Sequence, residues 1–395
     1  MATASVHQQI LDGNIHKKIP LSTYESNLEP TLQNLESLLP KTSSEKLPKF
    51  DPMIHLQYYS NELASHKYNN TRRITMKELG LENPNLQISP IGVSDPFPLF
   101  TEEAVTIMKK ELLTKDIFME NARYCFNSTS GLDCCLRGYV KTIDGKVNCP
   151  FIYEAWTNPK TMELISKMAG VDLEIIMNYE IGHVNISIKS NDQANEEIIK
   201  YERLMIDDKK RKNSGDDIPA VVGWHYDSYP FVCVLMLSDT TKMIGGETSL
   251  RMGTTKGENQ VAIIPSPQLG SASVLQGRLI EHIAPTPLGL SERMTMVTSF
   301  RAKNPSLKDS SILNTVKPEI NFGSRYNEFY SQWINYRCEL IKQKMDLINN
   351  KVKTGDSFNK DDITNDLKDV EDYVKKTYEE MMISKEEMAK MFQKK

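Results

Sequence analysis

The sequence predicts an α+β fold, in which a β-rich core is flanked by helices on its N-terminal and C-terminal sides. Short apolar segments separated by turn residues crowd the stretch 173–302, whereas helical spacing of apolar residues marks 96–172 and the stretch after Pro305. Hydrophobic residues make up 39% and charged residues 25% of the 395-residue chain, a mix that can bury a core. We therefore expect four regions, which are a polar N-terminal arm (1–95), a helical support region (96–172), the β-rich core (173–302) and C-terminal helices (303–395).

Helix-start and helix-end signals are clearest in the support region. Thr101 is a suitable N-cap, and Glu102 after it suits the positive end of a helix dipole. A second helix is predicted to begin at Pro159 and to end before Gly170, because proline favours the first turn and glycine the position after the last. Residues 1–50 are polar and interrupted by prolines, which predicts an extended arm with at most one short helix.

The core region is predicted to hold several short strands. The segment LEIIMNYEIGHVNISI is predicted as strand, and at its end His183, Asn185 and Ser187 alternate with apolar residues. A hydrophilic insert (190–217) is predicted as a surface helix with a loose end. Further strands are expected at WHYD, FVCVLML, ETSLRM, QVAIIP, ASVLQG and MTMVTSF, with a turn at Gly245-Gly246.

After the core, the chain is predicted to form two helices separated by KTGDSFNKDD. Aromatic residues line one face of the first helix, and aliphatic residues line one face of the second. We interpret these helices as packing elements, with a dimer interface as the alternative.

Composition argues against several classes of protein. The formal net charge of −4 and a pI near 6.1 argue against a nucleic-acid-binding surface, and the run KKRK (209–212) is interpreted as a solvated helix end. No apolar stretch is long enough to suggest a membrane span, and the N-terminus shows no apolar signal-peptide core. The six cysteines form no CxxC pair and are interpreted as reduced thiols, which favours a cytoplasmic protein without excluding the nucleus.

The short stretch WHYD carries the strongest chemical signal. In a strand, residues two apart point to the same side, so His225 and Asp227 would converge while Tyr226 points away. The sequence has seven histidines, and His282 lies in the same β-rich region, far enough on for the chain to return. Two histidines and one carboxylate on one face of an octahedron form the facial triad of non-haem Fe(II) oxygenases. We therefore predict His225, Asp227 and His282 as metal ligands.

A second signal lies downstream in the stretch SERMTMVTSF. Arg293 and Thr295 are again two residues apart on one predicted strand. A buried guanidinium beside a hydroxyl suits the binding of a carboxylate. Arg301 has the same strand parity but lies further from His282, so it ranks second as the anion-binding arginine.

The combined pattern resembles the Fe(II)/2-oxoglutarate-dependent dioxygenase superfamily. Its motif is HxD, a distal histidine, and an arginine followed two residues later by serine or threonine, and GGET (245–248) resembles a turn of the prolyl-hydroxylase-like branch. The resemblance covers 173–302. The phrases SDPFPLF, PFIYEAW and EIGHVNIS also resemble a fungal group of such oxygenases that has no assigned substrate.

The resemblance implies a jelly-roll (double-stranded β-helix) core, Fe(II) held by the triad, and 2-oxoglutarate and O₂ as co-substrates, with ascorbate expected to help. Arg293 and Thr295 would bind the far carboxylate of 2-oxoglutarate, and Asn185 and Tyr179 are further candidates for that site. The implied reaction is oxidation, chiefly hydroxylation, of an organic substrate with release of succinate and CO₂. We expect a small-molecule substrate, with a protein as the alternative, and the oligomeric state stays open.

Two rival functions remain at this point. One is a non-catalytic jelly-roll module that keeps the metal residues and acts by binding a partner. The other is a cupin-like enzyme that uses another metal and no co-substrate, for which Arg293 would not matter. Arg251, Gln276 and Arg278 lie near the predicted core and are interpreted as structural or exposed residues.

Overall fold

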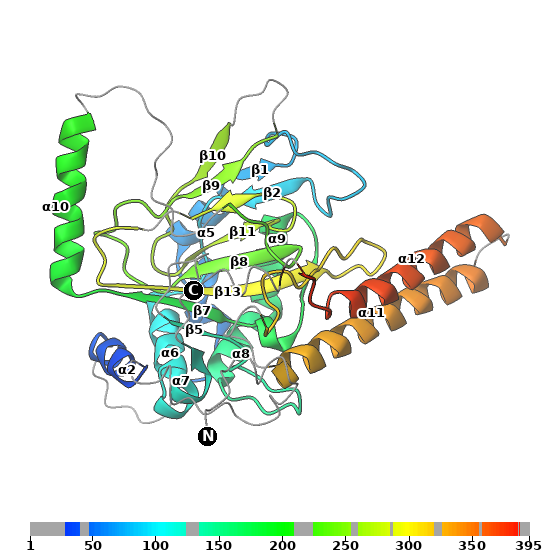
Figure 1. Ribbon diagram of the computed structural model, residues 1–395, viewed down its shortest axis with the longest axis horizontal. Helices are drawn as coiled ribbons and strands as arrows, with labels where there is room; N and C mark the ends of the chain where they lie inside the picture. Colours follow the sequence, from blue (N-terminus) through cyan, green and yellow to red (C-terminus); the bar gives the residue numbers. More distant parts are fainter. Residues whose placement is uncertain are drawn as a thin grey trace.

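The computed structural model describes residues 28–39, 47–123, 134–208, 224–253, 260–284, 287–319, 326–354, 358–385 and 387. In these parts of the chain, helices and antiparallel strands are combined in one α+β structure (Figure 1). Two sheets lie against each other and share a cluster of buried apolar residues, to which Val232 and Leu275 contribute from one sheet and Leu250 and Ile264 from the other.

The larger sheet has ten strands in the described residues. Its main path, from one edge to the other, is β1 (Arg73–Thr75), β2 (Ile91–Ser94), β11 (Ser271–Leu275), β8 (Phe231–Met236), β13 (Glu292–Ala302), β7 (His183–Ile188), β5 (Cys134–Leu136) and β4 (Ala122–Arg123). Off this path, β3 (Phe97–Pro98) pairs with β11, and β6 (Leu173–Ile175) pairs with β13. The smaller sheet contains β10 (Val261–Ile264), β9 (Thr248–Arg251) and β12 (His282–Ile283) in that order.

Helices cover the face of the larger sheet that points away from the smaller one. They are α6 (Glu102–Leu112), α7 (Lys115–Asn121), α8 (Pro150–Thr157) and α9 (Pro159–Ala169). Met294 and Met296 of β13 and Cys233 of β8 belong to the same buried cluster as Met108 and Trp156 of these helices. In the described residues four further helices precede them, namely α2 (Leu28–Ser37), α3 (Pro52–His55), α4 (Gln57–Ser60) and α5 (Glu62–Asn69).

The two helix boundaries predicted from capping signals are confirmed. The hydroxyl of Thr101 accepts a hydrogen bond from the backbone N–H of Ala104 at the start of α6. Helix α9 begins at Pro159 and is followed by Gly170, whose φ of 71° places it in the left-handed region that favours glycine.

The sequence predicted the stretch 173–188 as strand throughout, but the structure divides it. It forms β6 and β7, which are separated by a short 3-10 turn, η2 (Asn178–Glu180). Gly182 follows the turn with a φ of 65° and redirects the chain. Both strands pair with β13, whose eleven residues are long enough to form hydrogen bonds with β6 and β7 one after the other.

The larger sheet also takes strands from outside 173–302. β1, β2 and β3 come from residues 73–98, and β4 and β5 flank the undescribed stretch 124–133. Of the predicted arm, residues 1–27 and 40–46 lie outside the described residues. Residues 52–95, by contrast, are built into helices and the sheet, because Ile74 and Val93 are buried between the sheets.

Three longer helices stand apart from the sheets (Figure 1). The predicted insert contains α10 (Asn191–Asp208), and the KKRK run lies outside the described residues. The C-terminal region contains α11 (Tyr326–Thr354) and α12 (Lys360–Glu379), which pair as a hairpin that extends beyond the rest of the molecule. None of the helices in the described residues combines the length and apolarity that crossing a membrane requires.

The cysteines that fall within the described residues carry free thiols. Cys134, Cys135, Cys149 and Cys233 are buried, and Cys338 on α11 is exposed, whereas Cys125 lies outside the described residues.

Candidate metal centre

His225 and His282 are brought together by backbone pairing. The two residues form an antiparallel bridge, in which each backbone N–H donates to the carbonyl oxygen of the other at 3.1 and 2.9 Å. The WHYD stretch is therefore not a regular strand beyond this bridge. Asp227 is fixed separately, because its N–H donates to the carbonyl oxygen of Gly277 at 2.9 Å. Tyr226, between the two candidate ligands, is exposed, as the alternation predicted.

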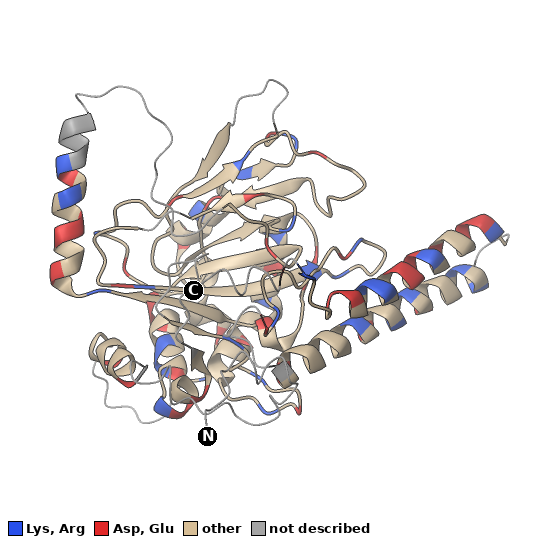
Figure 2. Ribbon diagram, viewed as in Figure 1, with Lys and Arg blue, Asp and Glu red and all other residues tan. Residues whose placement is uncertain are grey.

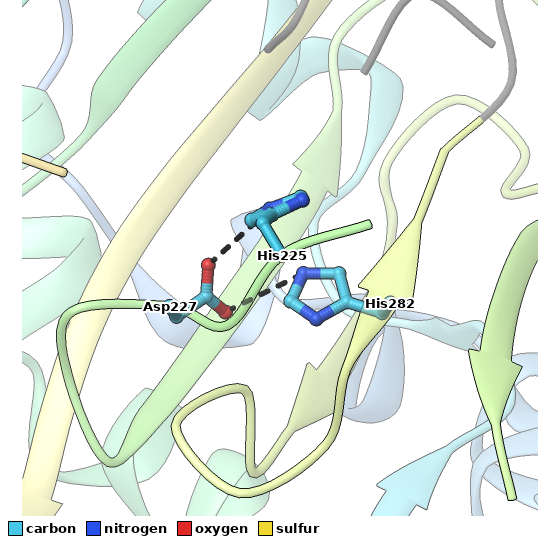
Figure 3. A group of neighbouring side chains, drawn as sticks. All are labelled: His225, Asp227 and His282. Atoms are coloured by element: carbon cyan, nitrogen blue, oxygen red, sulfur yellow. Dashed lines mark ion pairs between the residues drawn. The ribbon is translucent and has the colours of Figure 1, made fainter. Parts of the chain in front are cut away.

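The three side chains converge on one point (Figure 3). Nε2 of His225 lies 3.9 Å from Oδ1 of Asp227, and Nε2 of His282 lies 3.7 Å from Oδ2 of the same carboxylate. The imidazole rings are 4.3 Å apart between centroids. All three donor atoms lie within 4.8 Å of one another, and this is the one such group of potential ligands in the part of the chain that the structure describes.

Two details of this group fit a cation. Oδ2 of Asp227 is buried and has no hydrogen-bond partner among the described residues, which is costly for a carboxylate oxygen unless a cation satisfies it. Nδ1 of His282 lies 2.9 Å from the carbonyl oxygen of Ile280, and donation from Nδ1 leaves the lone pair of Nε2 directed at the group. Two nitrogen donors and one oxygen donor suit Fe(II) and related divalent ions.

Gly277 makes room for the carboxylate. A Cβ at this position would lie 1.7 Å from Oδ2 of Asp227, so any larger residue would displace the carboxylate from the two histidines. No local sequence pattern marks this role, because the contact joins residues that are fifty positions apart.

The polar face of β13 and β7 points toward the same inter-sheet space. Val297 of β13 packs against the apolar cluster between the two sheets, and Arg293 and Thr295 share its face at two-residue spacing. On the neighbouring strand, His183, Asn185 and Ser187 are directly opposite Val297, Thr295 and Arg293 and share that face. His282 is opposite Leu250, a residue of the same inter-sheet cluster, so its ring also points between the sheets.

Arg293 is a half-buried cation that has no ion pair among the described residues. Its Nε atom is buried and has no hydrogen-bond partner in the described residues, and burial lowers the pKa of its guanidinium. Thr295, two residues on, is buried beside it. The Nε atom of the rival arginine, Arg301, is also buried without a partner, but this arginine has a counter-ion, because its Nη2 lies 3.1 Å from Oε2 of Glu174 and its Nη1 donates to the carbonyl oxygen of Ala302.

A second buried charged group lies beside this face and was not found from the sequence. Arg137, just after β5, is 2% exposed, and its Nη2 donates to Oε1 of Glu180 at 2.5 Å. The hydroxyl of Tyr229, two residues after Asp227, donates to the same oxygen at 3.0 Å. Burial alone would lower the pKa of Arg137, but the carboxylate of Glu180 raises it. Burial and Arg137 together lower the pKa of His183 well below its usual range.

The remaining residues from the sequence analysis have other surroundings. Tyr179 is fully buried in a cluster with α11, where its ring meets Phe329 edge-to-face at 5.4 Å. Gln276 is used structurally, because its side-chain amide donates to the carbonyl oxygens of Ser89 and Ile91. Arg251 pairs with Glu281 at 2.9 Å, and Nε of Arg278 donates to the carbonyl oxygen of Ser310.

The similarity of this chain to known proteins is found at the level of structure. No protein-family model matches the sequence, and no curated protein matches it. Solved structures do match. They include an oxidoreductase of the 2OG-Fe(II) oxygenase family from Burkholderia pseudomallei, with 15% identity over 44% of this chain and 70% of that one and a TM-score of 0.28. A Pseudomonas putida prolyl-4-hydroxylase matches with 14% identity over 54% of this chain and 94% of that one, at a TM-score of 0.29. The α-ketoglutarate-dependent epimerase SnoN of nogalamycin biosynthesis matches with 12% identity over 49% of this chain and 69% of that one, at a TM-score of 0.30.

Proposed function

We propose that this protein is an Fe(II)- and 2-oxoglutarate-dependent dioxygenase that oxidises, chiefly by hydroxylation, an organic substrate. The observation that carries the proposal is the placement of two complementary features around one inter-sheet space. One is a His–Asp–His group with an unsatisfied carboxylate oxygen, and the other is a half-buried arginine whose Nε is buried and which has no ion pair among the described residues. A metal would satisfy the first feature, and a dicarboxylate that also binds the metal would satisfy the second.

Each residue has a separate role in this proposal. His225, Asp227 and His282 would hold Fe(II), with His282 kept in the correct tautomer by the carbonyl of Ile280. Arg293 and Thr295 would bind the far carboxylate of 2-oxoglutarate, and Asn185 faces the same space from β7. When bound together, Fe(II), 2-oxoglutarate and O₂ supply the oxidation of a C–H bond, with succinate and CO₂ as the co-products. We assign Tyr179 a packing role, because it lies in the cluster under α11.

We infer that the core is a jelly roll. Support comes from the order in which the chain visits the two sheets, which is β7, the His225 bridge, β8, β9, β10, β11, β12 and β13. β7, β8, β11 and β13 lie in the larger sheet, and the other four segments pair with the smaller one. Eight segments that alternate in this way between two antiparallel sheets have jelly-roll architecture. Such a core holds His225 and His282 on paired backbone, which favours a fixed metal site.

The first test measures metal binding and 2-oxoglutarate turnover separately. The wild-type protein should bind Mn(II), measured by EPR, and should release succinate from 2-oxoglutarate when Fe(II) and ascorbate are present. His225→Ala should lose both properties, whereas His66→Ala, which removes an exposed histidine of α5, should keep both. Metal binding without any 2-oxoglutarate turnover or binding would favour a non-catalytic binding module instead.

The second arm of the test concerns the arginine. Arg293→Met should raise the 2-oxoglutarate KM by roughly ten- to a hundredfold, since a charge-assisted contact to a carboxylate is worth about 1.5–3 kcal/mol. Arg301→Met is the matched control, because that arginine is already paired with Glu174. If the Arg293 variant kept the wild-type KM, a metal enzyme without this co-substrate would be the better explanation.

A further inference from the structure

The C-terminal hairpin carries an unusual share of the exposed apolar side chains. Of the nineteen large apolar residues that are exposed in the described part of the chain, nine lie between Ile334 and Met382. A hairpin stabilised only by its own two helices would be expected to expose polar residues on its remaining faces. Clustered apolar exposure of this kind marks an interaction surface.

The contacts between the two helices define which face of each is already used. The indole N–H of Trp333 donates to the carbonyl oxygen of Thr377, and Nε of Arg337 donates to the hydroxyl of Thr377. At the far end, Nζ of Lys351 lies 2.8 Å from a carboxylate oxygen of Asp366. Because higher numbers on α11 meet lower numbers on α12, the two helices run antiparallel.

The exposed apolar residues sit one position beyond these contacts. Lys344 also meets α12, because its Nζ lies 5.7 Å from the centroid of the Tyr373 ring. On α11, Ile334, Met345 and Val352 directly follow Trp333, Lys344 and Lys351, and they are 37%, 43% and 48% exposed. On α12, Leu367, Val374 and Tyr378 directly follow Asp366, Tyr373 and Thr377, and they are 44%, 43% and 53% exposed. One residue is a rotation of about 100° around a helix. In antiparallel neighbours the same rotation leads to the same side, so these six residues form one face, here called the hairpin face.

The spacing along this face is that of a helical bundle. The residues 334, 338, 341, 345, 348 and 352 of α11 follow one another at alternating intervals of four and three, and all are apolar or cysteine. On α12 the same intervals join residues 363, 367, 370, 374 and 377, of which Val370 and Thr377 are already buried within the protein. This repeat keeps an apolar seam directed at a neighbouring helix over several turns. Since both helices carry the repeat, the hairpin face fits a partner made of two helices.

The charges beside the hairpin face are balanced. On α11 they are Glu339, Lys342, Asp346 and Lys353, and on α12 they are Lys368, Glu371, Lys375 and Glu379, all exposed. Figure 2 shows acidic and basic residues mixed along α12 rather than gathered by sign. Equal numbers of both signs do not repel an identical surface, and they provide neither the basic rim that favours an anionic membrane nor an excess that favours a charged polymer.

We propose that the hairpin face binds a second copy of this chain, so that two hairpins form a four-helix bundle. A two-helix surface with balanced charge is complementary to itself, as a twofold-symmetric contact requires. The hairpin extends away from the sheets, which leaves the face accessible to a second molecule (Figure 1). This proposal is independent of the oxygenase function.

Molecular mass in solution tests the proposal. The full-length protein should have the mass of two chains in sedimentation equilibrium, and Met345→Lys/Val374→Lys should raise the dissociation constant by more than about tenfold, because two lysines would be buried in an apolar contact. Leu347→Lys is the matched control. Leu347 is 40% exposed but lies on the opposite side of α11, so this variant should stay dimeric. Val352→Lys/Leu367→Lys provides an independent pair at the tip of the hairpin.

The exposed thiol of Cys338 gives a second readout. Cys338 directly follows Arg337 and therefore lies on the hairpin face. Its alkylation, followed by peptide mass spectrometry, should be slow in the wild type at high concentration and fast in the lysine variants. A wild-type protein that has the mass of one chain at every concentration would overturn the proposal. So would a dimer that survives both lysine pairs, or a monomer whose hairpin face binds anionic vesicles instead.

Discussion

At the scale of single residues, His183 shows how the site limits charge. Its ring shares the inter-sheet face with the half-buried Arg293 and lies near the buried Arg137, so a proton on His183 would place a further cation close to both. Burial and Arg137 both lower the pKa of His183. The imidazole is therefore neutral near pH 7, when it can accept a hydrogen bond but adds no repulsion toward a bound metal.

This lowered pKa predicts a pH dependence of stability. The unfolded chain, in which histidine titrates near about 6.5, takes up a proton before the folded protein does. The free energy of unfolding should therefore fall as the pH drops below about 6.5, by up to about 1.4 kcal/mol per pH unit until the folded pKa is reached, and should be unaffected by His183 above that range. His183→Asn should lose less stability than the wild type between pH 7.5 and 5.5 in urea unfolding. Equal losses in both proteins would contradict the prediction.

The residues of the site differ in how far sequence could reveal them. His225 and Asp227 were predictable because two-residue spacing needs only local extended backbone, and Arg293 and Thr295 follow the same rule. Arg137, Glu180 and Gly277 were not predictable, because their partners lie far away in the chain and no local pattern marks them. The sequence placed Tyr179 with the polar residues of a predicted strand. In the structure the turn at 178–180 directs its side chain toward α11.

At the scale of elements, the base of the hairpin is fixed by one buried carboxylate. Asp309 accepts hydrogen bonds from the hydroxyls of Tyr336 on α11 and Tyr373 on α12, and Nη1 of Arg337 lies 3.4 Å from it. Burial alone would raise the pKa of Asp309, but Arg337 and the hydrogen bonds around it lower the pKa below its usual value. Asp309 belongs to the segment that follows β13, and its carboxylate therefore connects this segment to both helices.

Removing this charge should destabilise the protein. Asp309→Asn would leave Arg337 buried without a counter-ion, and we expect a loss of about 3 kcal/mol in the free energy of unfolding, measured by urea denaturation. The matched control is Asp362→Asn at the exposed tip of the hairpin, where the pair with Lys351 should be worth less than about 1 kcal/mol. The interpretation would be wrong if the two variants lost the same small amount.

Helices and strands could be located where specific residue types mark their ends, and they could not be located where the element is too short to show a pattern. α6 and α9 were located by their capping residues, which act within one turn. β1, β2 and β3 are two to four residues long, too short to show an alternation, and they become strands only because β11 and its neighbours offer hydrogen bonds. The split of 173–188 depends on Gly182, whose effect on chain direction is not set by hydrophobic pattern.

At the scale of the whole molecule, the hairpin and the candidate metal centre are connected through one loop. The segment after Asp309 contacts Ser228, the neighbour of Asp227. The N–H of Ile312 donates to the carbonyl oxygen of Ser228 at 2.8 Å, and the hydroxyls of Ser228 and Thr315 are 2.6 Å apart. The α+β class followed from the distribution of periodicities along the chain. The packing of two sheets was expected only from the family resemblance and not from the periodicity, because it depends on which strands pair at long range.

The position of the candidate ligands predicts how a metal should act on the whole fold. His282 belongs to the smaller sheet, whereas Asp227 leads directly into β8 of the larger one, so one bound ion would join both sheets. An ion that binds only the folded protein stabilises it by about 2.7 kcal/mol at a hundred times its dissociation constant, which is a few degrees in melting temperature for a chain of this size. We expect Mn(II) to raise the melting temperature of the wild type and 2-oxoglutarate to raise it further only when Mn(II) is present. Asp227→Asn should remove both increases, whereas Asp239→Asn, at an exposed loop position, should keep them. An increase that persists in the Asp227 variant would place the ion elsewhere and would separate the His–Asp–His group from metal binding.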